Sequence, residues 1–417
     1  MSAAVARDAE GVDRKVVIVG HVDHGKSTLI GRLLYDTGSL PASVSAELES
    51  LAAGRGEGLE FALLLDHLKE ERDEGITIDT AQAYVKGEGE RFVIIDAPGH
   101  REFLKNMLTG ATEANTALLM IDVREGLQEQ TRRHAHMLAL VGVRDLIVCV
   151  NKLDTVDWRR ERFQTIVDEL GAFLRRLDLT PTVVIPVSAK HGDNVASRSP
   201  RLGWYEGPCV LEALKALAPS ARLLTGPVRF PVQDVYRRRG TSILVGRVES
   251  GLLRAGDPLV VLPSGRGVVV RSIEVFGAEP TTAGAGESIG LILDQPDGIG
   301  RGDVVAGAAD PPTVSRTVPA RIFSLAKAAL RPGQRVTLKL ATQEVPASLA
   351  RIGRRVDSAT LETKDTSGSA VEETDVAEVA IEAERLVVFD RYTDVPEMGR
   401  FVLVEGRETL AGGLVIG

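Results

Sequence analysis

The feature that most constrains this chain is the stretch VVIVGHVDHGKSTLIGRLL at residues 16–34. Gly20, Gly25, Lys26 and Ser27 fit the pattern G-x-x-x-x-G-K-[ST], with an apolar β-rich run before it and an amphipathic helical run after it. In such a turn, backbone N–H groups and the N-terminus of the helix bind phosphate oxygens. The lysine reaches the β and γ phosphates, and the hydroxyl binds Mg²⁺. The stretch therefore predicts a strand, a phosphate-binding loop and a helix in succession.

The loop and the start of its helix supply a continuous set of candidate nucleotide contacts. These are His21, Val22, Asp23, His24, Gly25, Lys26, Ser27 and Thr28. His21 and His24 occupy filler positions of the pattern, and we interpret them as scaffolding that supports the loop. The pattern does not specify the base, so the identity of the nucleotide has to come from other motifs.

The first half of the chain alternates β-rich runs with helical patterns. The β-rich runs are VVIVG (16–20), FVIID (92–96), ALLMID (117–122), LIVCVN (146–151) and TVVIPVS (182–188). This alternation is typical of a mostly parallel sheet with helices on both faces. We therefore expect an α/β domain at 14–220, after a flexible tail at 1–13.

A different rhythm follows from Val228 onward. The predicted strands are short and alternating, and turn signals such as SG, AG and PSG separate them, which is typical of all-β barrels. Paired prolines in AADPPTVS (308–315) mark a boundary within this region. We expect two all-β barrel domains after the α/β domain, at 226–310 and 313–417.

The composition limits the class of protein. Its 44% apolar residues suffice for a core in each domain, and no segment approaches the roughly 18 consecutive apolar residues of a membrane span. A formal net charge of −8 argues against a general nucleic-acid binder, although a local basic patch can still bind a phosphate backbone. Two cysteines, in neither disulfide nor metal-ligand spacing, favour a reducing compartment. We expect a cytoplasmic protein that binds neither a membrane nor DNA.

Two further motifs supply what a site for nucleotide and Mg²⁺ needs. FVIIDAPGH places Asp96 at the end of a buried strand, where its carboxylate is expected to hold Mg²⁺ together with the Ser27 hydroxyl. The N–H of Gly99, in the turn that follows, is expected to contact the γ-phosphate. Thr77, in DEGITID, is a third candidate metal ligand, in a segment that would fold over the γ-phosphate and release after hydrolysis.

His100 follows the same Pro-Gly turn and is the candidate catalytic residue. A lone histidine is more often structural, but its position beside Gly99 favours a role in orienting the water that attacks the γ-phosphate.

The motif NKLD, at the end of the run LIVCV, indicates which base is bound. The Asp154 carboxylate can accept hydrogen bonds from both the ring N–H and the exocyclic amine of guanine. Adenine offers neither in that arrangement, so ATP would leave a buried carboxylate unpaired. Asn151 is expected to support the loop and the base edge, and the stem of Lys152 to cover one face of the base.

A second strand-end motif, SAK, completes the base site. It consists of Ser188, Ala189 and Lys190. The backbone N–H of Ala189 is expected to meet the guanine O6. Five motifs in order, each at the carboxyl end of a predicted strand, predict a switch domain that binds GTP or GDP with Mg²⁺.

The set GHVDHGKS, GITID, DAPGH, NKLD and SAK resembles the translation-factor class of GTPases. That resemblance implies a P-loop GTPase domain followed by two β-barrels, with the nucleotide and metal roles given above, and it matches His100 to the water-positioning histidine of the class.

Two branches of this class fit different stretches of the chain. ALLLDHLKEERDEGITID (62–79), GDNVASRSPRLGWYEGP (192–208) and RGDVVA (301–306) resemble the large, GTPase subunit of bacterial heterodimeric sulfate adenylyltransferase. DAPGHREFLKNMLTGAT (96–112) and QDVYRRRGTSILVGRVESG (233–251) resemble elongation factor 1-alpha and elongation factor Tu.

The sulfate branch is our primary expectation. It implies that GTP hydrolysis drives adenylyl transfer from ATP to sulfate, in a smaller catalytic partner subunit that binds ATP and sulfate. The alternative is a translational GTPase that carries aminoacyl-tRNA to the ribosome. A basic track over the barrels would favour the alternative, and Arg237, Arg238 and Arg239 form the one tight basic run there.

Overall fold

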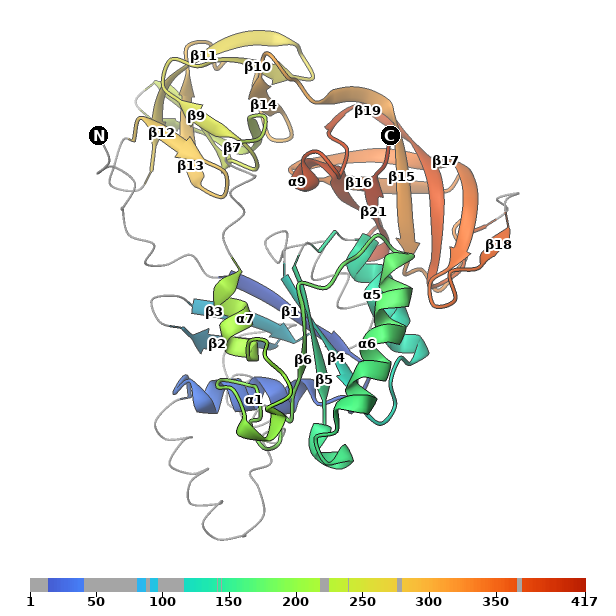
Figure 1. Ribbon diagram of the computed structural model, residues 1–417. Coiled ribbons are helices and arrows are strands. Elements are labelled where there is room, and N and C mark those ends of the chain that lie inside the picture. The colour runs from blue at the N-terminus through green and yellow to red at the C-terminus, as the bar shows by residue number, and fades with distance from the viewer. Residues whose placement is uncertain are drawn as a thin grey trace, which may run out of the picture. The chain divides into compact units, whose positions relative to one another are not determined.

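The computed structural model describes residues 14–40, 81–87, 91–96, 116–140, 142–143, 145–217, 225–238, 240–275, 280–365 and 370–417 (Figure 1). The chain divides into two compact units, at residues 1–217 and 218–417.

A six-stranded sheet forms the centre of the first unit, in the order β2-β3-β1-β4-β5-β6. The strands are β1 (Arg14–Gly20), β2 (Ala81–Lys86), β3 (Arg91–Asp96), β4 (Thr116–Asp122), β5 (Asp145–Asn151) and β6 (Val183–Pro186). All neighbours pair in parallel except β2 with β3. Every residue of β4 is buried, as expected for a strand covered on both faces.

Helices cover both faces of this sheet. They are α1 (Lys26–Asp36), α5 (Glu129–Leu140), α6 (Arg160–Arg175) and α7 (Val210–Ala216), with short 3₁₀ turns η1 (Leu153–Val156) and η2 (Pro200–Leu202). Val16 and Ile18 of β1 share a buried cluster with Leu33 of α1 and Leu214 of α7, so these two helices cover one face. Helices α5 and α6 lie on the other face (Figure 1).

A closed barrel opens the second unit, in the order β10-β11-β13-β8-β7-β14. Its strands are β7 (Arg229–Arg238), β8 (Thr241–Arg247), β10 (Pro258–Leu262), β11 (Arg266–Glu274), β13 (Ser288–Leu293) and β14 (Val304–Gly307), with β9 (Leu252–Arg254) and β12 (Thr282–Gly284) as a separate pair. Burial alternates along β13, so one side of the strand fills the barrel.

The rest of the second unit is a second ring of strands. It contains β15 (Thr313–Ser324), β16 (Arg335–Leu340), β17 (Gln343–Asp357), β18 (Thr363–Asp365), β19 (Asp375–Phe389), β20 (Arg400–Glu405) and β21 (Glu408–Val415), with the short helix α9 (Pro396–Gly399). The sheet order is β16-β20-β21-β15-β19-β17-β18, and β16 also pairs with β17, which closes the ring. The expected fold class, an α/β domain followed by two β-barrels, is confirmed. The domain boundaries expected from the sequence stay a prediction.

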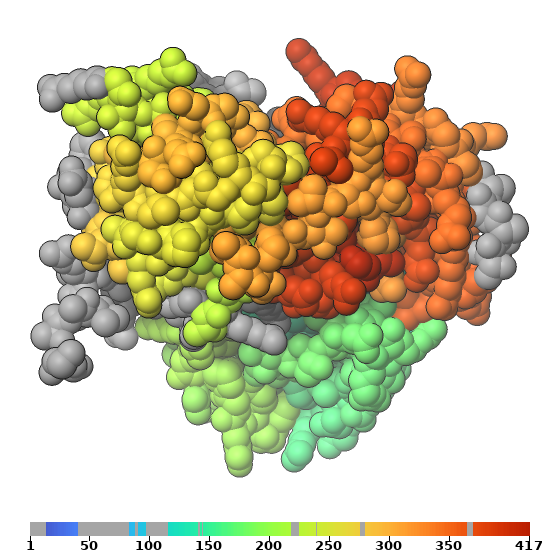
Figure 2. All heavy atoms as spheres, turned by 90° about the horizontal axis from the view of Figure 1, so that it is seen from above, coloured from blue at the N-terminus to red at the C-terminus, as the bar shows by residue number. Residues whose placement is uncertain are grey.

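The two barrels pack against each other within the second unit (Figure 2). Leu262, Val304 and Ala306 of the first barrel join the buried cluster of the second. At this junction Arg229, 1% exposed, donates from Nε and Nη2 to the two carboxylate oxygens of Asp390, at 2.7 and 2.9 Å. A buried, bidentate ion pair therefore joins the first strand of one barrel to the segment that follows β19 of the other.

Candidate nucleotide-binding site

The phosphate loop lies between the end of β1 and the start of α1. Gly25 is the N-cap of α1 and has φ of 92°, in the left-handed region that favours glycine. A β-carbon at Gly25 would also collide with the side-chain amide of Asn151. Glycine is therefore favoured at this position for two reasons, the backbone conformation and the close approach of the Asn151 side chain.

The Lys26 ammonium lies within this loop. Its Nζ donates to the carbonyls of Gly20 at 2.9 Å and His21 at 3.0 Å. Burial lowers the pKa of Lys26, while the carboxylates of Asp96 and Asp23 act to raise it. The lysine is therefore held at the loop, beside an acidic side chain, where phosphate oxygens would be bound.

Asp96 ends β3, which pairs in parallel with β1. The residue is buried, at 7% exposure, and it stands in register with Ile18, two residues before the phosphate loop. Ser27 lies in the first turn of α1. A carboxylate and a hydroxyl are oxygen donors of the kind that Mg²⁺ prefers, so these two residues fit the metal role predicted for them.

Asn151, at the end of β5, joins three loops. Its Nδ2 donates to the carbonyl of His24 in the phosphate loop at 2.9 Å, and its Oδ1 accepts from the N–H of Ala189 at 2.9 Å. Asn151 is 2% exposed. Both hydrogen-bonding atoms of the amide are thus used to hold together the loops that carry the predicted nucleotide contacts.

Asp154, in η1, is positioned by the SAK motif. Its Oδ1 accepts a hydrogen bond from the Ser188 hydroxyl at 2.6 Å, and Nε2 of His191 lies 3.9 Å from its Oδ2. The hydroxyl fixes one side of the carboxylate. The carboxylate retains the capacity to accept hydrogen bonds from two adjacent N–H groups of a base. Lys190 directly follows Ala189 and is exposed.

Lys152 is held by a carboxylate that the sequence analysis did not single out. Its Nζ lies 2.8 Å from Oδ2 of Asp122, the last residue of β4, and Nη2 of Arg124 lies 2.7 Å from the same oxygen. Burial acts to raise the pKa of Asp122, but the hydrogen bonds from Arg124 and Lys152 outweigh it and hold the pKa well below its usual range. A carboxylate at the end of a buried strand was the available signal, the same one that identified Asp96.

A second carboxylate, Asp193, supports the segments that carry the NKLD (151–154) and SAK (188–190) motifs, which we call the base loops, and it was also missed. It accepts from Nε1 of Trp158 at 3.0 Å and from the Ser199 hydroxyl at 2.5 Å, and Nη1 of Arg201 lies 3.5 Å away. Its backbone also pairs with that of Ser188. Asp193 therefore connects the segment after η1 to the SAK loop.

The remaining predicted residues fall into two groups: those in the phosphate loop and the first turn of α1, and those outside the described part of the chain. His24 is fully buried and its ring contacts protein atoms, while Val22 is 70% exposed and Asp23 has φ of 63°. Thr28 follows Ser27 in the first turn of α1. Three predicted residues lie outside the described part of the chain, namely Thr77, Gly99 and His100.

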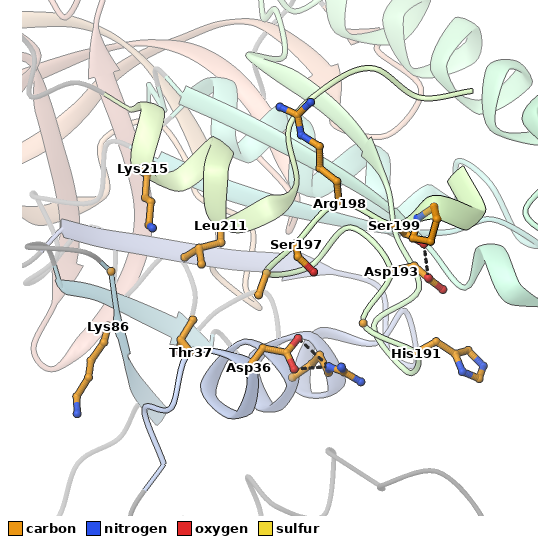
Figure 3. A pocket seen from close by; sticks show the side chains of 15 residues that line it. Asp36, Thr37, Lys86, His191, Asp193, Ser197, Arg198, Ser199, Leu211 and Lys215 are labelled. Carbon is orange, nitrogen blue, oxygen red and sulfur yellow. Dashed lines mark hydrogen bonds and ion pairs between the residues drawn. The ribbon is translucent and has the colours of Figure 1, made fainter. Parts of the chain in front are cut away.

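A polar hollow of about 690 Å³ lies beside the base loops, lined by residues of α1, β2 and α7 and by the segment 191–200 (Figure 3). It shares His191 and Asp193 with the surroundings of the base loops, but no residue of the phosphate loop lines it. The candidate nucleotide site is therefore the loop cluster at the carboxyl ends of the strands rather than this hollow. Among the described residues, no helix is long and apolar enough to span a membrane.

Three family models match the chain, one over the α/β domain and one over each barrel region. The family model "Elongation factor Tu GTP binding domain" matches residues 13–220, "Elongation factor Tu domain 2" matches 242–306, and "GTP-eEF1A C-terminal domain-like" matches 317–416.

Curated relatives match over nearly their whole length. Elongation factor 1-alpha of Archaeoglobus fulgidus is 37% identical, over 99% of this chain and 99% of that protein. The same factor from Staphylothermus marinus is 39% identical over 96% and 95%, and that from Aeropyrum pernix is 38% identical over 98% and 97%. A crystal structure of sup35 complexed with GDP covers 100% of this chain and 97% of that chain at 26% identity, with a TM-score of 0.46. Because that score is low, the family assignment rests on the sequence relatives.

These matches overturn the primary expectation from the sequence. The reading as a GTPase subunit of sulfate adenylyltransferase, with a smaller ATP- and sulfate-binding partner, is wrong, because the full-length relatives are elongation factors 1-alpha. The structure explains why the segment 192–208 misled. Asp193 and Ser199 in that segment bond each other, and Asp193 also accepts from Trp158, so these residues hold loops of the GTP-binding domain together and do not identify what the GTPase acts on.

Proposed function

This chain belongs to the family of translation-factor GTPases that includes elongation factor 1-alpha and elongation factor Tu, and we propose that in its GTP form it carries aminoacyl-tRNA to the ribosome. The observation that carries this proposal is the match to elongation factor 1-alpha across the GTP-binding domain and both barrels. The proposed site of action is the cytoplasm, where ribosomes work.

In this proposal the base loops select guanine. The Asp154 carboxylate, oriented by Ser188, accepts from the ring N–H and the exocyclic amine of guanine, and the N–H of Ala189 approaches O6. The Ala189 N–H also bonds Asn151, so Asn151 sets its position. The stem of Lys152, whose ammonium is anchored on Asp122, covers one face of the base.

The phosphates bind at the loop from Gly20 to Ser27. When nucleotide arrives, Lys26 exchanges its contacts with the Gly20 and His21 carbonyls for phosphate oxygens, and the helix N-terminus adds N–H donors. Mg²⁺ neutralises phosphate charge when bound. Ser27, Asp96 and, from the sequence pattern, Thr77 are its proposed ligands.

Hydrolysis and switching are assigned from the sequence motifs. His100 orients the attacking water, Gly99 contacts the γ-phosphate, and the segment with Thr77 closes on the γ-phosphate and is released after hydrolysis. We propose that contact with the ribosome triggers the reaction.

For tRNA we propose a contact on the first barrel. Tyr236, Arg237 and Arg238 at the end of β7 are all exposed, and Tyr236 is 58% exposed. An aromatic ring beside two guanidinium groups suits a sugar-phosphate backbone with an unstacked base or end. The double variant Arg237→Ala, Arg238→Ala should weaken aminoacyl-tRNA binding and leave GTP binding unchanged. Arg254→Ala, an exposed arginine of the same unit, is the matched control.

The test of the proposed function is GTP hydrolysis in single-turnover reactions with and without ribosomes of the source organism. We expect ribosomes charged with a message to accelerate hydrolysis by the wild-type protein. In His100→Ala, hydrolysis should be slow under both conditions while GTP affinity stays near the wild-type value. Wild-type hydrolysis that ribosomes do not accelerate would contradict the translational role. Equal loss of GTP binding and hydrolysis in the variant would show that His100 is structural.

A further inference from the structure

A cluster of potential metal ligands lies on the phosphate loop, apart from the proposed Mg²⁺ ligands. It consists of His21, His24 and Glu125, whose ligand atoms all lie within 4.8 Å of one another. His21 and His24 belong to the loop, and Glu125 lies in the turn that follows β4. His24 is fully buried and the Glu125 side chain is 39% exposed, so the cluster reaches from the interior to the surface.

Hydrogen bonds to backbone carbonyls define how both imidazoles present their nitrogens. Nδ1 of His24 lies 3.1 Å from the carbonyl of Met120, and Nδ1 of His21 lies 2.9 Å from the carbonyl of Val22. A carbonyl can only accept a hydrogen bond, so each Nδ1 carries the proton. In a neutral imidazole protonated at Nδ1, Nε2 carries an unshared lone pair and can bind a metal ion.

The contact between His24 and Glu125 suits a bound cation. Nε2 of His24 lies 3.2 Å from Oε2 of Glu125, so in the neutral ring a lone pair faces a carboxylate oxygen. A second proton on His24 would satisfy this contact, but it would place a positive charge on a fully buried ring. A metal ion bound by both groups satisfies the contact without charging the buried ring.

The ligand set identifies the kind of ion. Two imidazole nitrogens and one carboxylate are a common set for Zn²⁺, and a zinc-bound histidine characteristically donates its other N–H to a backbone carbonyl or a carboxylate. Mg²⁺ prefers oxygen ligands and is a poor competitor for this set. Tetrahedral zinc with bonds near 2.0–2.1 Å holds two ligands about 3.4 Å apart. The 3.2 Å between His24 and Glu125 is close to this spacing, and the ligand atoms of His21, His24 and Glu125 all lie within 4.8 Å of one another.

We propose that His21, His24 and Glu125 bind a zinc ion, with water in the fourth position. The ion would tie the phosphate loop to the turn after β4, while Asn151 holds the same loop through the His24 carbonyl. Bound zinc should therefore stiffen the loop and slow GDP release. This proposal concerns the loop itself and does not depend on which client the GTPase serves.

The test uses the untagged, full-length protein, freed of metal with a chelator and then saturated with GDP and excess Mg²⁺. Titration with Co²⁺, which reports tetrahedral nitrogen and oxygen ligation by its visible absorption, should reach one equivalent, and Zn²⁺ should abolish the signal. Glu125→Gln keeps the size of the side chain and removes its charge, and should weaken Co²⁺ binding at least about tenfold. Glu129→Gln, which changes a carboxylate on α5 that pairs with Arg133, is the matched control and should bind as the wild type does.

GDP affinity and thermal unfolding are measured on each protein so that loss of the ion is not confused with loss of the fold. If Glu125→Gln does not fold, His21→Asn, which removes the half-buried ligand, replaces it and is expected to weaken Co²⁺ binding equally. A wild-type protein without the tetrahedral cobalt spectrum would overturn the proposal, as would a folded ligand variant that binds Co²⁺ with wild-type affinity. Neither result would bear on the translational role, which is measured with ribosomes.

Discussion

The side-chain amide of Asn151 donates a 2.9 Å hydrogen bond to the backbone carbonyl of His24, which joins the base loop to the phosphate loop. The two residues are far apart in the sequence, yet the contact is buried at both ends. A single side chain thus joins the loop predicted to read the base to the loop predicted to hold the phosphates.

The first prediction separates the two hydrogen bonds of Asn151. Asn151→Asp retains an acceptor for the Ala189 N–H but loses the donor to the His24 carbonyl, and it brings a carboxylate close to a carbonyl oxygen. A buried carbonyl left unpaired costs about 1–3 kcal/mol, so GDP affinity should fall by about 5- to 150-fold. The dissociation constant of a fluorescent GDP analogue measures this. Wild-type affinity in the variant would show that the link between the loops does not matter for binding.

The second prediction concerns base selection by Asp154. Asp154→Asn replaces one acceptor by a donor, so it should weaken binding of guanine nucleotides and improve binding of xanthine nucleotides, whose C2 oxygen accepts. Competition between GDP and XDP for the protein gives the ratio directly. Asp157→Asn, an exposed carboxylate nearby, serves as the control. An unchanged preference for GDP in Asp154→Asn would remove the base-reading role from this residue.

The third prediction is an acid-dependent loss of stability at Asp122. Its pKa in the folded protein is held below the usual value by Arg124 and Lys152, so its contribution is complete above about pH 4 and is lost as the pH falls toward the folded pKa. Asp122→Asn should therefore be less stable than the wild type at neutral pH, and the difference should shrink below about pH 4.

Tryptophan fluorescence during urea unfolding measures this effect in the right part of the chain. The chain has 2 tryptophans, Trp158 and Trp204, and both lie in the first unit with Asp122. A stability difference between wild type and Asp122→Asn that does not change with pH would contradict the assignment.

The fourth prediction compares two ion pairs of the second unit. Asp390→Ala leaves the guanidinium of Arg229 buried and unpaired, and should lower the free energy of unfolding by about 3–5 kcal/mol. Glu378→Ala breaks the exposed pair with Arg321 and should cost less than about 1 kcal/mol. Denaturant unfolding followed by far-ultraviolet circular dichroism gives both values. Equal effects of the two substitutions would show that the junction between the barrels does not depend on the Arg229–Asp390 pair.

Much of the fold could be predicted because its signals are local. The phosphate loop needs glycine at Gly25 and a lysine beside it, and the strand runs around it are apolar because both faces of the sheet are covered. Alternating burial in strands such as β13 likewise follows from the sequence pattern. These constraints act within a few residues and can be recognised in a single sequence.

The long-range pairings that support the site could not be predicted in the same way, although Asp122 itself carries the same signal as Asp96. Lys152 reaches Asp122, and Trp158 reaches Asp193, across 30 and 35 residues respectively. Such pairs depend on strand order and loop path rather than on a local pattern. The motifs also could not identify the molecule that the GTPase acts on, because the residues predicted to bind guanine nucleotide do not depend on that molecule.

The most direct test of the proposed function is protection of the aminoacyl ester. Aminoacyl-tRNA from the source organism is incubated with the purified protein bound to a non-hydrolysable GTP analogue or to GDP, and the rate of deacylation is measured. We predict that the GTP-analogue form slows deacylation strongly while the GDP form leaves it near the rate of free aminoacyl-tRNA. Equal deacylation rates with both forms and without protein would contradict the account that this chain is a carrier of aminoacyl-tRNA.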